Sequence, residues 1–220
     1  ESCSCPIEDL EKTIETISYR FLKNLGGKVV QKSPVTIRQE PSYGGTSITK
    51  LRSSYKTLSV SQVHSMANVS MRKRDEYGFS GHSTINHDYN LKTIGGDKVV
   101  IDRATGLMWH QGGSRKYMKW NKAKKWIKKL NEGSWLNKSG YAGYHDWRLP
   151  TLEEAASLLE SNKRNDLYID PVFSNKQKWI WTGDSEDGSE AAWIVYFHNG
   201  HVLCSIFDNR YYVRPVRSVE

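Results

Sequence analysis

Residues 143–159 read GYHDWRLPTLEEAASLL, and the second half of this stretch carries the clearest structural signal in the chain. Thr151 and Glu154 have the T-x-x-E spacing of a capping box, in which each side chain accepts a hydrogen bond from the other residue's backbone N–H. Apolar residues follow at three- and four-residue steps: Leu152, Ala155, Leu158 and Leu159. The stretch therefore predicts a helix that begins after Thr151 and buries one stripe of side chains.

The sequence downstream of this helix is dominated by β-strand patterns. Aromatic and β-branched residues fill 179–184, 191–203 and 211–219. The dipeptide Asn199-Gly200 lies between two apolar runs, which is a strong hairpin signal. We expect further turns at Gly183 and Gly188. Helices early and antiparallel strands late predict an α+β fold with a mainly antiparallel sheet.

A second helix is predicted at 120–132, and its outer face is strongly basic. Its inner face would consist of Trp120, Ala123, Ile127 and Leu130. Residues 114–138 hold nine basic side chains and one acidic side chain, a net charge of +8 that equals the charge of the whole chain. We interpret this patch as a solvated helix face; contact with sulfate, phosphate or an acidic partner is the alternative. Nucleic acid is not an expected partner, because its binders spread charge and aromatic rings along a groove.

The chain divides into three parts. Residues 1–49 are predicted to form an amphipathic helix at 7–24 and then an extended segment. Residues 50–90 are predicted to pack on the main domain through a short Ser-capped helix near 58–69, followed by a polar loop with surface histidines that include His87. Residues 91–220 form the main domain, which opens with two strands joined by a turn within 97–110.

Composition excludes several classes of protein. No apolar run approaches 18 residues, so we expect no membrane span. Cys3 and Cys5 lack the second thiol pair of a zinc site, which leaves free thiols or a bridge to Cys204 as alternatives. The chain starts without Met or a signal-peptide apolar region, so we expect that any signal peptide was removed or never present. No cofactor is expected.

Several groups of residues, taken in chain order, form a recognisable set. They are Asp102 with Thr105-Gly-Leu-Met-Trp109, Trp120 with Ala123, Gly143-Tyr144, Asp146 through Thr151 with Glu154, Trp179, Trp181-Thr182, and Val213-Arg214 with Val216-Arg217-Ser218. In this order they resemble the Lcl-type C-terminal domain over about residues 97–219; the family is named from a bacterial collagen-like adhesin and was long catalogued as a domain of unknown function. The family resemblance implies a C-type lectin-like fold, in which the terminal strands of the domain pair beneath a long irregular loop region.

Within such a fold, bulky aromatic residues would seal a small core under the loops. The candidates are Trp109, Trp147, Trp179 and Trp181. We expect Arg148 and Arg217 to be structural and to bind loop carbonyls or carboxylates such as Asp102 and Asp146.

The same fold also hosts formylglycine-generating oxidases, so an enzyme is an alternative to consider. Those oxidases use a pair of cysteines, whereas this domain has only Cys204 and shows no Ser/His/Asp arrangement. We therefore predict a protein that is not an enzyme. The acidic loop 184–190 suggests calcium, but the sugar-coordinating signatures of calcium-dependent lectins are absent, so a solvated loop without metal is the prediction.

The C-terminal stretch has an unusual composition. Lys, Glu, Gln, Trp and Met make up 50 of the 220 residues, yet none occurs from 194 to 219, where about six would be expected in proportion. These are the five residue types that an Asn codon ending in C cannot reach when its adenines are mutated. The stretch thereby resembles the variable region of proteins diversified by retroelements, and an ordinary hairpin in a lysine-poor core is the alternative.

We therefore hypothesise a non-enzymatic recognition module whose partner is a protein or a surface glycan, because rings, amides and a guanidinium gather here as in evolved binding sites. The candidate ligand-binding residues are Trp181, Tyr196, His198, His201, Ser205, Phe207, Asp208, Asn209, Arg210 and Tyr211. The alternative is an adhesin that binds sulfated polysaccharide through Lys122, Lys125 and Lys129 on the basic helix. An extracytoplasmic or cell-surface location is expected, with the cytoplasm as the alternative; the oligomeric state is not specified by the sequence.

Overall fold

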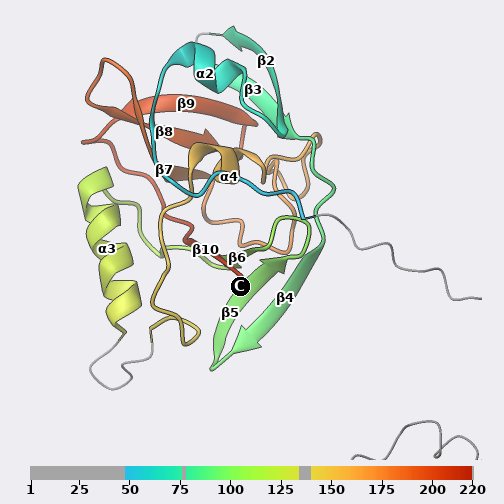
Figure 1. Cartoon of the computed structure of the whole chain (residues 1–220), viewed down its shortest axis with the longest axis vertical. Helices are drawn as coiled ribbons and strands as arrows, with labels where there is room; N and C mark the ends of the chain where they lie inside the picture. The colour runs from blue at the N-terminus through green and yellow to red at the C-terminus, as the bar shows by residue number, and fades with distance from the viewer. Residues whose placement is uncertain (1–47, 76–77, 134–139, 220) are drawn as a thin grey trace, which may run out of the picture. The chain divides into compact units, whose positions relative to one another are not determined.

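The computed structural model describes residues 48–75, 78–133 and 140–219 (Figure 1). The helix predicted at 7–24 and the extended segment after it lie outside the described residues. Two sheets lie at opposite ends of the domain in this view, with one short helix between them and a longer helix along one side.

The larger sheet has six strands in the order β1-β7-β8-β9-β3-β2. Their bounds are β1 Thr57–Leu58, β2 Val69–Asp75, β3 Gly78–Ser83, β7 Trp179–Glu186, β8 Ala191–Tyr196 and β9 His201–Ile206. All neighbours are antiparallel except β1 and β7, which run parallel. The Asn199-Gly200 turn joins β8 to β9, as predicted, and Gly200 adopts a φ of 72° there. The strands predicted late in the chain thus form the centre of this sheet.

The smaller sheet has four antiparallel strands in the order β10-β6-β5-β4. Their bounds are β4 Tyr89–Ile94, β5 Asp97–Asp102, β6 Leu107–His110 and β10 Val216–Ser218. Because β10 pairs with β6, the end of the chain returns to strands near the start of the domain.

Three helices are formed within the described ranges: α2 Val60–His64, α3 Trp120–Glu132 and α4 Leu152–Ala156. Ser59 and Thr151 are the N-caps of α2 and α4, and both complete capping boxes. Local sequence therefore determines where these two helices begin. Leu158 and Leu159 are buried as predicted, although α4 ends before them. None of the helices in the described ranges combines the length and apolarity that a membrane crossing needs.

The main core lies between the two sheets and around α4. It joins Trp109 and Val216 of the smaller sheet to Ile180 and Trp193 of the larger one, with Leu152 of α4 among them. A second cluster lies on the other side of the larger sheet, where Trp120, Ala123 and Ile127 of α3 pack. The predicted α+β class with mainly antiparallel sheets is confirmed.

The prediction of a polar loop from residue 70 to residue 90 is wrong, because this stretch holds nearly all of β2, the whole of β3 and the start of β4. His87 is not a surface histidine. Its Nδ1 lies 2.7 Å from Oδ2 of Asp102, and its Nε2 lies 2.7 Å from the carbonyl oxygen of Ser157. These partners are 15 and 70 residues away, which is why local sequence did not reveal the contact.

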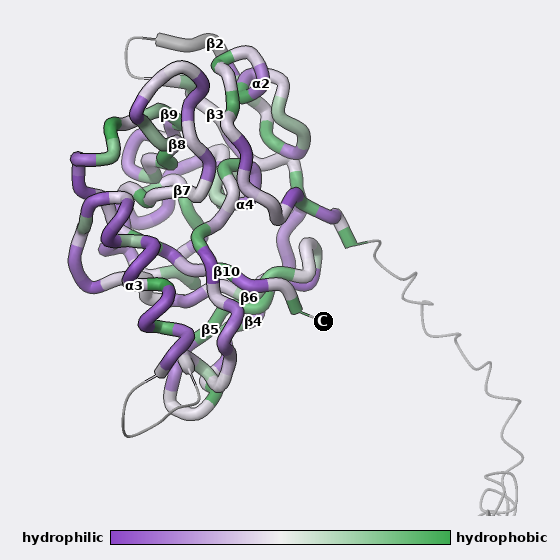
Figure 2. The backbone as a smooth tube through the Cα atoms, turned by 60° about the vertical axis from the view of Figure 1, so that its left-hand side comes forward, coloured by the Kyte–Doolittle hydropathy of each residue, from purple (hydrophilic) through white to green (hydrophobic). Residues whose placement is uncertain are grey.

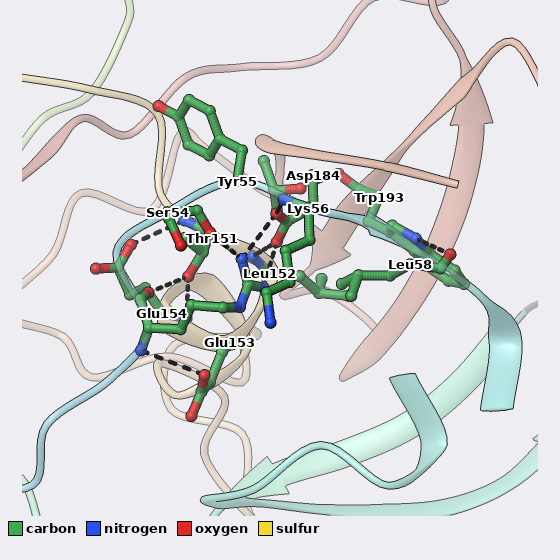
Figure 3. Close-up of polar contacts among 12 residues, drawn as sticks. Ser54, Tyr55, Lys56, Leu58, Thr151, Leu152, Glu153, Glu154, Asp184 and Trp193 are labelled. Carbon is green, nitrogen blue, oxygen red and sulfur yellow. Dashed lines mark hydrogen bonds and ion pairs between the residues drawn. The ribbon is translucent and has the colours of Figure 1, made fainter. Parts of the chain in front are cut away.

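Residues 52–58 form a strap across the N-terminus of α4 and along β7 (Figure 3). The buried carboxylate of Asp184 accepts from both terminal nitrogens of Arg52, at 3.0 and 2.7 Å, and from the backbone N–H groups of Lys56 (2.7 Å) and Leu152 (2.6 Å). Further along, the indole N–H of Trp193 donates to the carbonyl of Leu58 at 3.2 Å. The strap therefore belongs to the same folded unit as the strands it crosses.

The prediction of a turn at Gly183 is also wrong, because this residue lies inside β7. A Cβ at this position would lie 2.1 Å from the ring of Tyr55, whose hydroxyl donates to the carbonyl of Leu149 at 3.0 Å. The glycine thus makes room for the strap.

The two arginines have carboxylate partners. Arg148 forms two hydrogen bonds to Glu154, at 2.7 and 2.6 Å, and Arg217 donates to Asp146 at 2.7 Å. Asp102, suggested as a partner, binds His87 and Thr105 instead. The capping glutamate of α4 therefore also anchors the Trp-Arg-Leu-Pro segment.

Candidate functional site

The candidate site is one face of the larger sheet, and strand register builds it. Trp179 of β7 pairs with Tyr196 of β8, which pairs with His201 of β9, which pairs with Ser80 of β3. Residues directly opposite each other in antiparallel strands point to the same face, so these four side chains form a row across the sheet. We define the aromatic face as this row and its neighbours on the same side: Ser80, Trp179, Tyr196, His198, His201, Leu203, Ser205 and Tyr211.

One end of this face is covered by α3 and by the segment that follows β9. Trp181 is fully buried there: its indole N–H donates to the carbonyl of Met118 at 2.7 Å, and its ring meets the edge of Tyr211 at 4.8 Å. Trp181 was expected at the edge of the binding surface, and this expectation was wrong. Phe207 stacks on Trp120, with ring centroids 4.5 Å apart, and is a partly buried residue that packs against the second core cluster.

The opposite end of the face is partly exposed and begins at Trp179. Sequence analysis assigned Trp179 to the core, but its side chain is only partly buried. Its ring meets Tyr196 edge-on at 5.1 Å, and Tyr196 stacks on His198 at 5.9 Å. Trp179 and Trp181 point to the same side of β7, so the difference between them comes from the cover that only Trp181 receives. Their two-residue spacing is the sequence signal that could have placed Trp179 on the face.

Two polar atoms at this open end lack partners. Within the described part of the chain, neither Nε1 of Trp179 nor Nδ1 of His198 forms a hydrogen bond, although both atoms are buried. Buried polar groups without partners are uncommon, and leaving them unpaired costs free energy.

Hydrogen bonds hold the polar side chains near the end of β9 in place. The hydroxyls of Ser205 and Tyr211 are 3.0 Å apart, and the side-chain amide of Asn209 donates to Ser205 Oγ at 2.8 Å. The backbone of Tyr211 exchanges two hydrogen bonds with Met118, at 2.8 and 3.1 Å. Side-chain and backbone hydrogen bonds therefore both fix this part of the aromatic face.

Among the predicted ligand-binding residues, those in the turn after β9 are the most exposed. Asp208, Asn209 and Arg210 are exposed, and Asp208 accepts from the ammonium of Lys119 at 2.9 Å. Arg210 forms no ion pair with any described residue. The guanidinium therefore stands at the border of the face, available to a partner.

The cysteine considered for an oxidase and the acidic loop considered for calcium do not belong to the aromatic face. Cys204 pairs with Trp193 and packs against the main core, on the side of the sheet opposite the aromatic face. In the acidic loop 184–190, Asp184 points inward to Arg52, so its carboxylate is committed to the fold. Trp109 and Trp147 are buried in the core.

The basic face of α3 is a separate surface, and the helix is mostly hydrophilic along its length (Figure 2). Lys122, Lys125 and Lys129 are exposed and form no ion pair with described residues. Lys124 instead lies over the ring of Trp120 at 3.2 Å, and burial lowers the pKa of its ammonium. Three lysines thus remain available as point charges.

Comparison with known families places this geometry in context. The family model described as the Lcl C-terminal domain matches residues 98–217, from β5 to β10. No curated protein matches the chain. The match contains the whole aromatic face except Ser80, yet it leaves out β1 and β3, which pair with β7 and β9.

Proposed function

The chain belongs to the Lcl C-terminal domain family, and from this membership and the aromatic face we propose that it is a non-enzymatic recognition module. Its partner would be a protein or a surface glycan. The observation that carries the proposal is the row of Trp179, Tyr196 and His201 across three paired strands, with Tyr211 beside it. Rings on a rigid frame bind with little loss of conformational entropy, which is the design of evolved binding sites.

The test uses binders selected from a glycan array and from a displayed peptide library. Tyr196→Ala and Arg210→Ala should each weaken a selected binder about tenfold or more, or about 1.4 kcal/mol. Lys163→Ala, a change outside the aromatic face, should leave affinity unchanged. Thermal unfolding of each variant is the control for an intact fold. The proposal fails if binders bind both the Tyr196→Ala and the Arg210→Ala variant as tightly as the unchanged chain, or if neither library yields a binder.

Phe207 and Tyr211 are unsuitable for this test, although they are candidate site residues. Phe207 stacks on Trp120, and Tyr211 packs on Trp181, so alanine at either position removes core contacts. A loss of binding in these variants would mix a fold effect with a contact effect.

We also propose that residues 194–219 are diversified and that the scaffold is C-type lectin-like. Inward residues of this stretch, such as Val195, Phe197 and Val202, are buried and apolar, whereas Tyr196 and His201 face outward. Such a pattern lets outward side chains vary without changing the core. The test is the neighbouring DNA: a near-copy of the codons for this stretch, differing only at adenines and lying beside a reverse transcriptase gene, is expected. A genome without such a copy would overturn this part of the proposal.

The second candidate function is adhesion to sulfated polysaccharide through α3. It is favoured by the exposure of Lys122, Lys125 and Lys129. Contacts between exposed charges are screened by salt, so retention on heparin should fall as salt rises. Reversal of charge at Lys122 and Lys125 should abolish retention if α3 is the site, whereas Tyr196→Ala should leave it unchanged. Equal retention of the charge-reversed variant would exclude this function.

A further inference from the structure

A concave site lies outside the aromatic face. It is a cavity of ≈ 790 Å³ bounded by the β4–β5 turn, the loop after β6, α3 and residues 174–177. This volume falls within the range of small-molecule sites. Its charged and aromatic lining consists of Lys98, Arg115, Lys116, Trp126, Tyr141 and Lys176, with Asp97 as the acid.

The lining carries an excess of positive charge. None of its four cations forms an ion pair with a residue in the described ranges. Asp97 is already engaged, because its carboxylate accepts from the backbone N–H of Ala142 at 2.8 Å. The cavity therefore offers several unpaired cations around a concave surface, where their fields add.

A fully buried guanidinium behind the cavity adds to this field. Arg214 donates to the carbonyls of Gln111 (2.6 Å) and Ser174 (3.1 Å) and to the side-chain oxygen of Gln177 (3.3 Å), and all three residues line the cavity. These acceptors are neutral, and no carboxylate of the described chain pairs with Arg214. Burial lowers the pKa of Arg214 to about 9, so it is still charged at neutral pH. An uncompensated buried charge favours an anion nearby.

The other wall of the cavity is aromatic. His110 stacks on Tyr141, with ring centroids 3.9 Å apart and planes 11° from parallel, and Trp126 lies 6.4 Å from His110. Burial, with the nearby charge of Arg214, lowers the pKa of His110 to about 3, so the ring is neutral. Its Nδ1 accepts from the backbone N–H of Gly113 at 3.0 Å, which leaves the proton on Nε2. Rings of this kind stack on flat ligands.

We infer that this cavity binds a small molecule that carries a carboxylate on a ring, with the ring against Trp126 and Tyr141 and the carboxylate toward Arg115, Lys116 and Lys176. Arginine and lysine recognise carboxylates through charge-assisted hydrogen bonds, which neutral ligands cannot match. The ring can be aromatic or a pyranose, because both present an apolar face to an aromatic wall. This inference goes beyond the proposed recognition through the aromatic face and shares no residue with it.

Saturation-transfer NMR with the full chain tests the inference. The probes are 4-hydroxyphenylacetate and glucuronate, each beside a neutral counterpart, 4-hydroxyphenylacetamide and methyl glucoside. Binding of at least one acid in the millimolar range or tighter is expected, with its neutral counterpart at least about tenfold weaker. The acid that binds identifies the kind of ring. Absence of binding by both acids, or equal binding of acid and neutral counterpart, would overturn the inference.

Matched variants locate the binding. Arg115→Ala and Lys176→Ala change exposed side chains, so the fold should persist; each should weaken the acid roughly fivefold to tenfold. Lys50→Ala removes the same charge from a residue that does not line the cavity, and affinity should not change. Tyr196→Ala on the aromatic face should also leave it unchanged. Equal affinities for the unchanged chain and both cavity variants would show that the acid binds elsewhere.

Discussion

Position 183 shows how one missing side chain admits a distant segment. The ring of Tyr55 occupies the space that a Cβ at Gly183 would need, and its hydroxyl reaches the carbonyl of Leu149. Sequence reasoning interpreted this glycine as a turn because glycine is most common there. Its actual role is close approach within a strand, which is the other common reason for glycine in a sheet.

We predict that Gly183→Ala destabilises the domain by about 1–3 kcal/mol, because the added methyl group displaces the Tyr55 ring. In a Tyr55→Ala background the same change should cost much less, since the obstacle is gone. Gly112→Ala is the matched control, because its nearest neighbour would lie 3.9 Å away. Urea unfolding of the unchanged chain, the two single variants and the double variant measures these costs. Equal costs of Gly183→Ala in both backgrounds would show that the Tyr55 ring is not the obstacle.

Asp102 makes the stability of the domain depend on pH. Burial alone would raise the pKa of this carboxyl, but hydrogen bonds from His87 and Thr105 outweigh it and hold the pKa below its usual value. A carboxyl with a lowered folded pKa stabilises the fold above its unfolded pKa of about 3.9 and loses this contribution as pH falls through the folded value.

We therefore expect Asp102→Asn to lower the unfolding free energy at pH 7 and to flatten its decline at acid pH. The difference between the original chain and the variant should shrink as pH falls below about 4. Chemical unfolding at several pH values measures this difference. A gap that stayed constant down to pH 2 would show that Asp102 does not cause the dependence.

At the scale of elements, local signals identify the helices better than the early strands. Ser59 and Thr151 define their capping boxes within four residues, so α2 and α4 could be predicted. β2 and β3 could not, because their sequences are polar and their order comes from pairing with each other and with β9. The family match begins after these strands, although β3 extends the sheet that carries the aromatic face.

We predict that a fragment of residues 98–217 does not unfold cooperatively, whereas a fragment of residues 45–220 does. The shorter fragment lacks the strap, β1 and β3, and therefore leaves Asp184 without Arg52 and exposes the edges of β7 and β9. Circular dichroism during heating, with both fragments at equal concentration, measures the difference. A sharp transition in the short fragment would contradict this reasoning.

At the scale of the molecule, the two proposed sites draw on different sheets and adjoin at Met118, which lines the cavity and exchanges backbone hydrogen bonds with Tyr211 of the aromatic face. The aromatic face lies on the larger sheet, whereas the cavity uses the β4–β5 turn of the smaller sheet and the loop after β6. They share no lining residue. The whole-chain charge of +8 gives no sign of this separation, because it sums a basic helix with an acidic C-terminal half.

We predict that the two sites are energetically independent. The changes in unfolding free energy caused by Arg115→Ala and Tyr196→Ala should add in the double variant to within about 0.5 kcal/mol, as expected for two residues that form no contact with each other. Denaturant unfolding of the single and double variants measures this. A larger coupling would indicate that the face and the cavity communicate.

The chain's local sequence determines its α+β class, the starts of α2 and α4, the hairpin at Asn199-Gly200 and the basic face of α3. Each depends on contacts or periodicity within a few residues, where residue type and spacing suffice. The tertiary structure decides that Trp179 is only partly buried while Trp181 is fully buried, that Asp184 anchors the strap, and that a buried Arg214 lies behind a cationic cavity. These outcomes depend on cover and partners more than 30 residues away, so the physical cause is packing between elements, which residue spacing along the chain does not encode.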